Sequence, residues 1–204
     1  MQHTMLNIFK PKGSFDYRGI EPPPPFKPFC DMDAVEAQRH FEWFISQSEP
    51  RRRLLLEAVE ATGGEVTACD YTPPSLVPLW GTMSGFFQSR PMTREEEARL
   101  YDTSPAAAQQ AKLDLRELTT ATACLALDIG FYVAEVYMRL YPQVRWLLCT
   151  KRNQAFNKPI LTGFKLPLVP SDMVIGSVWK HLATPRDTLL FDIYRLWEQD
   201  VAQH

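Results

Sequence analysis

Residues 125–164, LALDIGFYVAEVYMRLYPQVRWLLCTKRNQAFNKPILTGF, indicate the fold class of this chain more clearly than any other segment. The first part runs as far as Tyr141-Pro142 and is apolar on almost every side, which is typical of an enclosed helix. Residues 145–150 and 159–164 alternate partly between apolar and polar positions, which predicts two strands joined by a polar loop. The segment therefore predicts a central buried helix followed by a small antiparallel sheet.

The predicted helix covers residues 122–140. Four polar residues recur along it at positions i, i+4, i+7 and i+11: Asp128, Tyr132, Glu135 and Arg139. That spacing places them on one face. A buried carboxylate needs a partner, because its desolvation is costly. Three interpretations stay open. The residues form a structural seam that holds neighbouring backbone or Trp146, or Asp128 and Glu135 face a protein partner, or these two acids form a catalytic pair.

Helical patterns also fill the N-terminal half of the chain. A D-x-x-E capping pattern at Asp33 predicts a helix to about residue 47. Pro50 suits the first turn of a second helix, which Gly63-Gly64 ends, so the two helices are expected to form an αα-hairpin. Arg51 to Arg53 then lie at the start of the second helix. They are interpreted as a solvated basic corner, with phosphate binding as the alternative.

Further helices are predicted over residues 75–87, 93–101, 104–139 (with a break near 118–120), 171–183 and from 184 onward. Trp80 lies among dense apolar residues at helical spacing and is assigned to the core. Tyr132 and Trp146 are likewise given structural roles. Gly163, inside the second strand, predicts a bulge or a close approach of another backbone segment.

The first 30 residues differ in composition from the rest. Prolines at 11, 22–25 and 28 exclude regular helix, and residues 22–25 predict polyproline II. Aromatic residues flank this run and predict that the arm docks on its own domain: Phe15, Tyr17, Phe26 and Phe29. Recognition of the proline run by a partner's aromatic groove is the alternative. The expected organisation is a proline-rich arm over residues 1–30 and one mostly helical α+β domain over residues 31–204.

Composition excludes several functional classes. The net charge of −2 gives no general attraction to nucleic acid or to an anionic membrane. The N-terminus lacks an apolar region of signal-peptide length, and no apolar run reaches the length of a membrane helix, so we expect a cytoplasmic protein. Cysteines 30, 69, 124 and 149 are far apart without a CxxC pair, which predicts free thiols rather than a zinc site or disulfides.

Motifs for catalysis and cofactors are missing from the sequence. The chain has no GxxxxGK[ST], GxGxxG, GxSxG or HExxH pattern, and its four histidines are scattered. The sequence therefore predicts no enzyme, no cofactor and no metal site. The polar loop between the two strands offers a different type of site: Lys151, Arg152 and Asn153 are candidate partner-binding residues, since such a loop varies without disturbing the core.

Motifs over residues 70–164 resemble those of a poorly characterised group of small bacterial proteins. The matching residues are Asp70-Tyr71-Thr72 with Ser75-Leu76 and Leu79-Trp80, then Gly130-Phe131 with Glu135, then Arg145-Trp146, and last Asn157, Pro159 and Gly163-Phe164. Members of this group are associated with polymorphic-toxin loci, where they look like immunity proteins. The resemblance implies a protein that binds and neutralises a cognate bacterial toxin.

Under this hypothesis the partner-binding residues are Asp128 and Glu135 together with Lys151, Arg152 and Asn153. Two alternatives remain. One is a regulatory or scaffold module that binds a protein unrelated to toxins, and the other is a hydrolase that uses Asp128 and Glu135. The oligomeric state stays open.

Overall fold

The computed structural model describes residues 17–22, 27–103 and 115–201. Three expectations fall outside these residues: the polyproline conformation of residues 23–25, the docking of Phe15 and Phe26, and a helix start at Ser104-Pro105.

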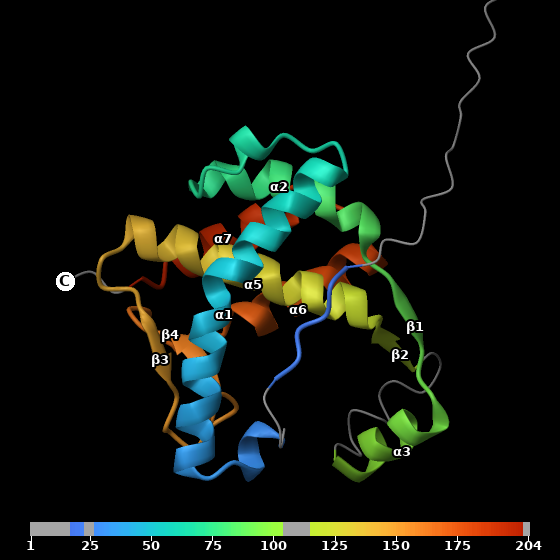
Figure 1. Ribbon diagram of the computed structural model, residues 1–204, viewed down its shortest axis with the longest axis vertical. Coiled ribbons are helices and arrows are strands. Elements are labelled where there is room, and N and C mark those ends of the chain that lie inside the picture. The colour runs from blue at the N-terminus through green and yellow to red at the C-terminus, as the bar shows by residue number, and fades with distance from the viewer. Residues whose placement is uncertain (1–16, 23–26, 104–114, 202–204) are drawn as a thin grey trace, which may run out of the picture.

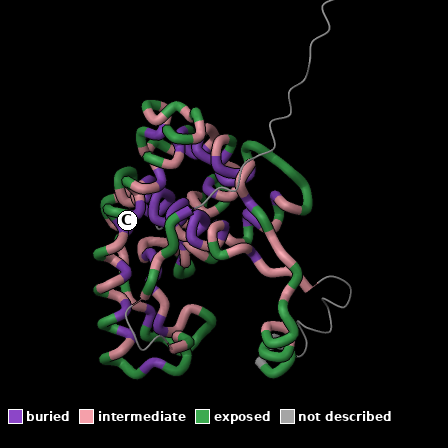
Figure 2. The backbone as a smooth tube through the Cα atoms, turned by 45° about the vertical axis from the view of Figure 1, so that its right-hand side comes forward, coloured by how far each residue is buried: buried purple, intermediate pink, exposed green. Residues whose placement is uncertain are grey.

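Helix α5 (Thr120–Leu140) lies at the centre of the fold, and helices α1 (Ala34–Ala61) and α6 (Pro170–Ala183) pack along it (Figure 1). Buried residues gather around this helix (Figure 2), and most of its own residues are buried. Helices α2 (Leu76–Met83) and α7 (Leu189–Glu198) contact each other and complete the helical layer. The predicted fold class, a mostly helical α+β domain around an enclosed helix, is confirmed.

Two small antiparallel sheets accompany the helices. Strand β3 (Trp146–Leu148) pairs with β4 (Pro159–Leu161), as the sequence predicts, with Trp146 opposite Leu161. A second sheet joins β1 (Ser89–Pro91) to β2 (Arg116–Leu118), where a helix was expected to continue up to a break near residues 118–120. That expectation is wrong because three-residue strands are too short to show a period. The Arg116 guanidinium fastens the pair by donating to the side chain and the carbonyl of Ser89.

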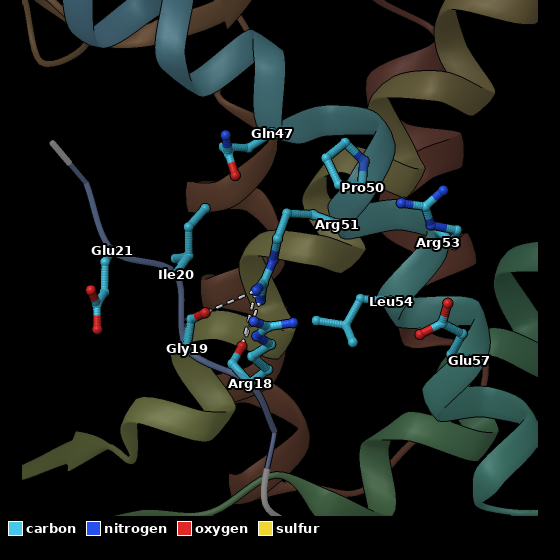
Figure 3. Close-up of a pocket in the computed structure, with 10 residues that line it drawn as sticks. All are labelled: Arg18, Gly19, Ile20, Glu21, Gln47, Pro50, Arg51, Arg53, Leu54 and Glu57. Carbon is cyan, nitrogen blue, oxygen red and sulfur yellow. Dashed lines mark hydrogen bonds between the residues drawn. The ribbon is translucent and has the colours of Figure 1, made fainter.

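The predicted αα-hairpin is also wrong, because residues 34–61 form a single helix with Pro50 inside it. Its buried residues follow one continuous helical stripe: Ala37, His40, Phe44, Ser48, Arg51, Leu55 and Val59. Proline removes one backbone hydrogen bond and bends a helix. The axis of α1 accordingly changes direction near Pro50 (Figure 3), and the buried stripe continues through both halves of the helix.

The remaining helix predictions differ in detail. The capping box at Thr93 and Glu96 opens α3 (Arg94–Thr103) as expected. The last helix begins at Leu189 rather than near Thr184-Pro185. The intervening turn is held by His181, whose Nδ1 accepts from the backbone N–H of Arg186 at 3.2 Å.

Helix α5 has the length and composition of a membrane-spanning helix, alone among the helices in the described part of the chain. However, 72% of its apolar window is buried inside the fold. A core helix has these same properties, so the apolar character of α5 is accounted for by its contacts with the surrounding helices.

Two helical glycines allow a matched test of how closely α5 and α6 approach. A Cβ atom at Gly130 would lie 3.2 Å from the backbone nitrogen of Ser171, whereas one at Gly176 would meet nothing within 4 Å. We expect Gly130→Ala to destabilise the protein by about 1–3 kcal/mol, because backbone atoms must move. Gly176→Ala should stabilise it by up to about 1 kcal/mol through helix propensity. Chemical denaturation measures both, and equal effects would contradict the close approach.

Candidate functional site

The polar face of α5 is anchored by a buried ion pair. Asp128 is fully buried, and its Oδ1 accepts a hydrogen bond of 2.7 Å from Arg51 Nε. Its Oδ2 accepts from the hydroxyl of Tyr17. The Arg51 guanidinium also donates to the carbonyl oxygens of Arg18 and Gly19, at 3.0 and 3.1 Å (Figure 3). One carboxylate and one guanidinium thus connect α5, α1 and the segment of residues 17–22, which we call the strap.

These contacts correct two interpretations from sequence. Arg51 is not part of a solvated basic corner, since its side chain is only 7% exposed and is paired. Asp128 offers no surface to a protein partner, because none of it is exposed. Tyr17 docks on the domain as predicted, and it is 6% exposed.

Burial controls the protonation of this cluster. It raises the pKa of Asp128 to about 6, and the hydrogen bonds from Arg51 and Tyr17 together with the Arg51 charge oppose that rise. Burial also raises the pKa of Tyr17 far above its ordinary value, and the Asp128 carboxylate raises it further. Tyr17 therefore stays a neutral phenol, and its hydroxyl donates a hydrogen bond to the carboxylate.

Glu135 lies two turns further along the same face and has different partners. Its Oε2 is 3.1 Å from Arg52 Nη1, its Oε1 accepts from Arg139 Nε at 2.8 Å, and its side chain is 18% exposed. Seven residues of helix separate it from Asp128 by roughly 10 Å along the axis. Neither acid lines any of the cavities described below. None of these cavities of the described residues therefore brings the two carboxylates together.

Trp80 and Tyr132, which were assigned structural roles, are both fully buried. The indole N–H of Trp80 donates to the carbonyl of Arg186 at 3.1 Å. The hydroxyl of Tyr132 accepts from the backbone N–H of Tyr71 at 3.0 Å and lies 2.7 Å from the Ser75 hydroxyl. Each large side chain thus fixes a connecting segment against the core.

Trp146 packs the β3–β4 sheet against two helices, and Gly163 lies close to the segment that connects α5 to β3. The Trp146 ring packs on Phe44 of α1 and Phe131 of α5, with centroid distances of 5.5 and 6.2 Å. Its buried indole nitrogen has no hydrogen-bond partner among the described residues. Gly163 has φ +89°, and a Cβ atom there would lie 3.1 Å from the Gln143 carbonyl oxygen. A close backbone approach, one of the two expectations for this glycine, is what the structure contains.

The polar loop between β3 and β4 is exposed at its tip and fixed at its base. Lys151, Arg152 and Asn153 are exposed. Asn157, at φ +61°, is buried, and its side-chain amide donates to the carbonyls of Phe29 and Met32 at 2.9 Å each. The backbone N–H of Ala155 donates to the Asn153 side chain at 2.8 Å. The loop therefore presents its three candidate residues from a hydrogen-bonded frame.

Two open grooves flank this loop. The first has a volume of about 520 Å³ and is lined by Cys30, Arg152, Asn153, Gln154 and Phe156. The second has a volume of about 510 Å³ and is lined by Asn153 to Ala155, Pro167 to Val169, Asp172, Met173 and Trp197. Because Asn153 and Gln154 belong to both, the loop is a ridge between two adjoining hollows. We call the loop tip and these two grooves the loop face.

A further cavity of about 440 Å³ lies beside the strap, where Arg18, Arg51 and Arg53 line it together with Glu21 and Glu57 (Figure 3). The guanidinium of Arg51 is already bound to the strap carbonyls. In the described ranges, no three His, Cys, Asp or Glu side chains gather at a possible metal site. The four cysteines are free thiols.

No family model matches the chain, and no curated protein or solved structure shows significant similarity to it. The resemblance to immunity proteins therefore rests on the sequence motifs alone and stays a prediction. The functional proposal below is therefore argued from the fold and from the chemistry of the described residues.

Sequence reasoning missed two residues that organise this region. Arg51 was placed at a helix start because its partner, Asp128, is 77 residues away and no local pattern connects them. Asn157 appeared only as part of a motif. Its positive φ belongs to a conformation in which asparagine is enriched among non-glycine residues, and that was the available signal.

The ion pair can be tested by removing first one charge and then both. Arg51→Met leaves the buried Asp128 carboxylate unpaired, so we expect the free energy of unfolding to fall by about 3–5 kcal/mol at neutral pH. Adding Asp128→Leu removes the orphaned charge and should restore much of that loss. Denaturant unfolding of both variants measures the effect, and a double variant that sums two independent losses would contradict the pairing.

The raised pKa of Asp128 predicts a particular pH dependence. The folded value of about 6 exceeds the ordinary 3.8, so the folded state holds this proton more tightly than the unfolded state. The contribution of Asp128 to stability is then complete below the ordinary pKa and is lost as the pH rises through the folded pKa. We therefore compare the unfolding free energies of the wild type and of Asp128→Asn. The difference, wild type minus variant, should decrease as the pH rises from 3.8 to about 6. A difference independent of pH would refute the raised pKa.

Proposed function

We propose that this protein acts by binding another protein through the loop face, and that the partner is a bacterial toxin domain whose activity it blocks. One observation carries the proposal: Lys151, Arg152 and Asn153 are exposed on a hydrogen-bonded loop that stands between two adjoining grooves. The toxin as partner is supported by the resemblance of residues 70–164 to immunity proteins.

A preformed loop supports a role in binding. Ordering a flexible loop on association costs free energy, and a loop that is already fixed avoids that cost. The hydrogen bonds of Asn157 to the carbonyls of Phe29 and Met32 tie the loop base to the segment before α1. The tip is left exposed, and the guanidinium of Arg152 lies 5.7 Å from the centroid of the Phe156 ring.

The chemistry of the loop face suits a partner surface that is acidic and partly apolar. Lys151 and Arg152 supply positive charge at the ridge, which favours association with negatively charged groups. Trp197 and Met173 line the second groove, and aromatic side chains, methionine and arginine are enriched in protein interfaces. An interface of standard size buries about 800 Å² on each partner, so its footprint would extend from the ridge into both grooves.

Co-expression tests the proposal directly. If the proposal holds, a toxin domain encoded beside this protein should kill the host when expressed alone, and this chain should restore growth and co-elute with the domain in size-exclusion chromatography. Unchanged killing without a complex would rule out the toxin. A complex without restored growth would leave protein binding in place but refute neutralisation.

Charge reversal locates the binding surface. We expect Lys151→Glu with Arg152→Glu to weaken the complex at least tenfold, because two attractive contacts become repulsive. Lys180→Glu with Arg94→Glu makes the same change in net charge at two exposed positions that line neither groove. This control should bind normally. Equal weakening by both double variants would show that net charge, and not the loop face, governs binding.

A further inference from the structure

An apolar cavity of about 310 Å³ opens where the strap, α1, α5, β4 and α6 meet. Six of its apolar lining residues come from five segments: Phe29, Trp43, Phe44, Leu127, Pro159 and Ile175. An engineered cavity of about 150 Å³ with a similar apolar lining is large enough to bind benzene. The cavity therefore has room for an aromatic ring together with a short substituent.

The polar groups of this cavity include one ion pair. Lys158 Nζ lies 2.7 Å from Asp172 Oδ2, and the two side chains are 26% and 52% exposed. Both residues line the cavity, and their exposure shows that solvent reaches this side of it. His40 also lines the cavity, among the rings of Phe29, Trp43 and Phe44, and burial lowers its pKa. A ligand thus meets an apolar interior and, at the exposed side, one cation beside one anion.

We propose that this cavity binds a zwitterionic aromatic molecule of the α-amino acid type, at a site that adjoins the loop face and shares Val169 and Asp172 with its second groove. The ring enters the apolar interior, the carboxylate accepts from the Lys158 ammonium, and the ligand ammonium donates to the Asp172 carboxylate. Lys158 and Asp172 already pair with each other, so a ligand that carries both charges gives each side chain a replacement partner of opposite charge. A ligand carrying only one of the two charges pairs with one side chain and places a like charge beside the other.

A free amino acid carries both the ammonium and the carboxylate, whereas each end of a peptide chain carries only one of them. Three compounds separate these sources: phenylalanine carries both charges, phenylalaninamide keeps only the ammonium, and N-acetylphenylalanine keeps only the carboxylate. We expect calorimetric titration of the full chain to show phenylalanine binding at least tenfold more tightly than either blocked compound. Equal binding of a blocked compound would overturn the two-charge site, and binding by none of the three would overturn the site altogether.

Variants of the lining residues localise the binding. Ala123→Leu extends a side chain from α5 into the cavity and should abolish binding of phenylalanine. Lys158→Met should weaken it about tenfold, because a charge-assisted hydrogen bond is lost. Lys165→Met is the matched control, since Lys165 is also ion-paired, to Asp200, but does not line the cavity. Normal binding by Ala123→Leu, or equal loss in both lysine variants, would refute the assignment.

The indole N–H signal of Trp43 provides a second readout, assigned by its disappearance in Trp43→Phe. Phenylalanine should shift this signal, because Trp43 lines the cavity. The variant Lys151→Glu with Arg152→Glu should bind phenylalanine like the wild type, since neither residue contributes to the cavity. A variant that loses toxin binding can thus still bind phenylalanine, so each proposal can fail without the other.

Discussion

The buried pair of Arg51 and Asp128 is the constraint on which the arrangement of the N-terminal half depends. An unpaired charge inside a protein is very costly, so each member requires the other to be in place. Arg51 reaches Asp128 only because α1 continues through Pro50 with its buried stripe unbroken. The remaining guanidinium donors then hold the strap carbonyls, and the strap in turn places Tyr17 on the second carboxylate oxygen. Helix bend, strap position and the polar residue at the core of α5 are thus parts of one hydrogen-bonded unit.

The polar residues of α5 divide into an inner and an outer set. Asp128 and Tyr132 are fully buried, and each binds a segment that is not part of a regular helix or strand. Glu135 lies nearer the surface and joins Arg52 to Arg139, whose guanidinium is 4.1 Å from the centroid of the Tyr71 ring. The seam therefore fastens α1, the strap and the segment before α2 to one helix. The carboxylates of Asp128 and Glu135 are both engaged in these structural contacts.

Local sequence patterns were enough to predict the structural features that are determined by residues close together in the chain. The enclosed helix follows from its apolar composition, the capping box at Thr93 from three-residue spacing, and the β3–β4 pair from alternation around a polar loop. The close approach at Gly163 also follows from local sequence, because a glycine inside a strand indicates it. Other features depend on contacts between distant residues. Nothing near Arg51 indicates a partner 77 residues away, and nothing in three residues around Arg116 distinguishes a strand from a helix.

The proline at position 50 illustrates why such contacts override local rules. Inside a helix, proline costs about 3 kcal/mol or more, which favours a break on local grounds. A break would place Arg51 in the first turn of a new helix, where the helix dipole disfavours a cation. In the continuous helix, Arg51 lies beyond the bend and enters the core opposite Asp128, while Phe44 and Leu55 stay on the same buried face. Burial along the whole stripe and the buried ion pair together outweigh one missing backbone hydrogen bond. The exposed loop, by contrast, takes part in none of these core contacts at its tip, so residues 151–153 can vary in sequence while the core is preserved.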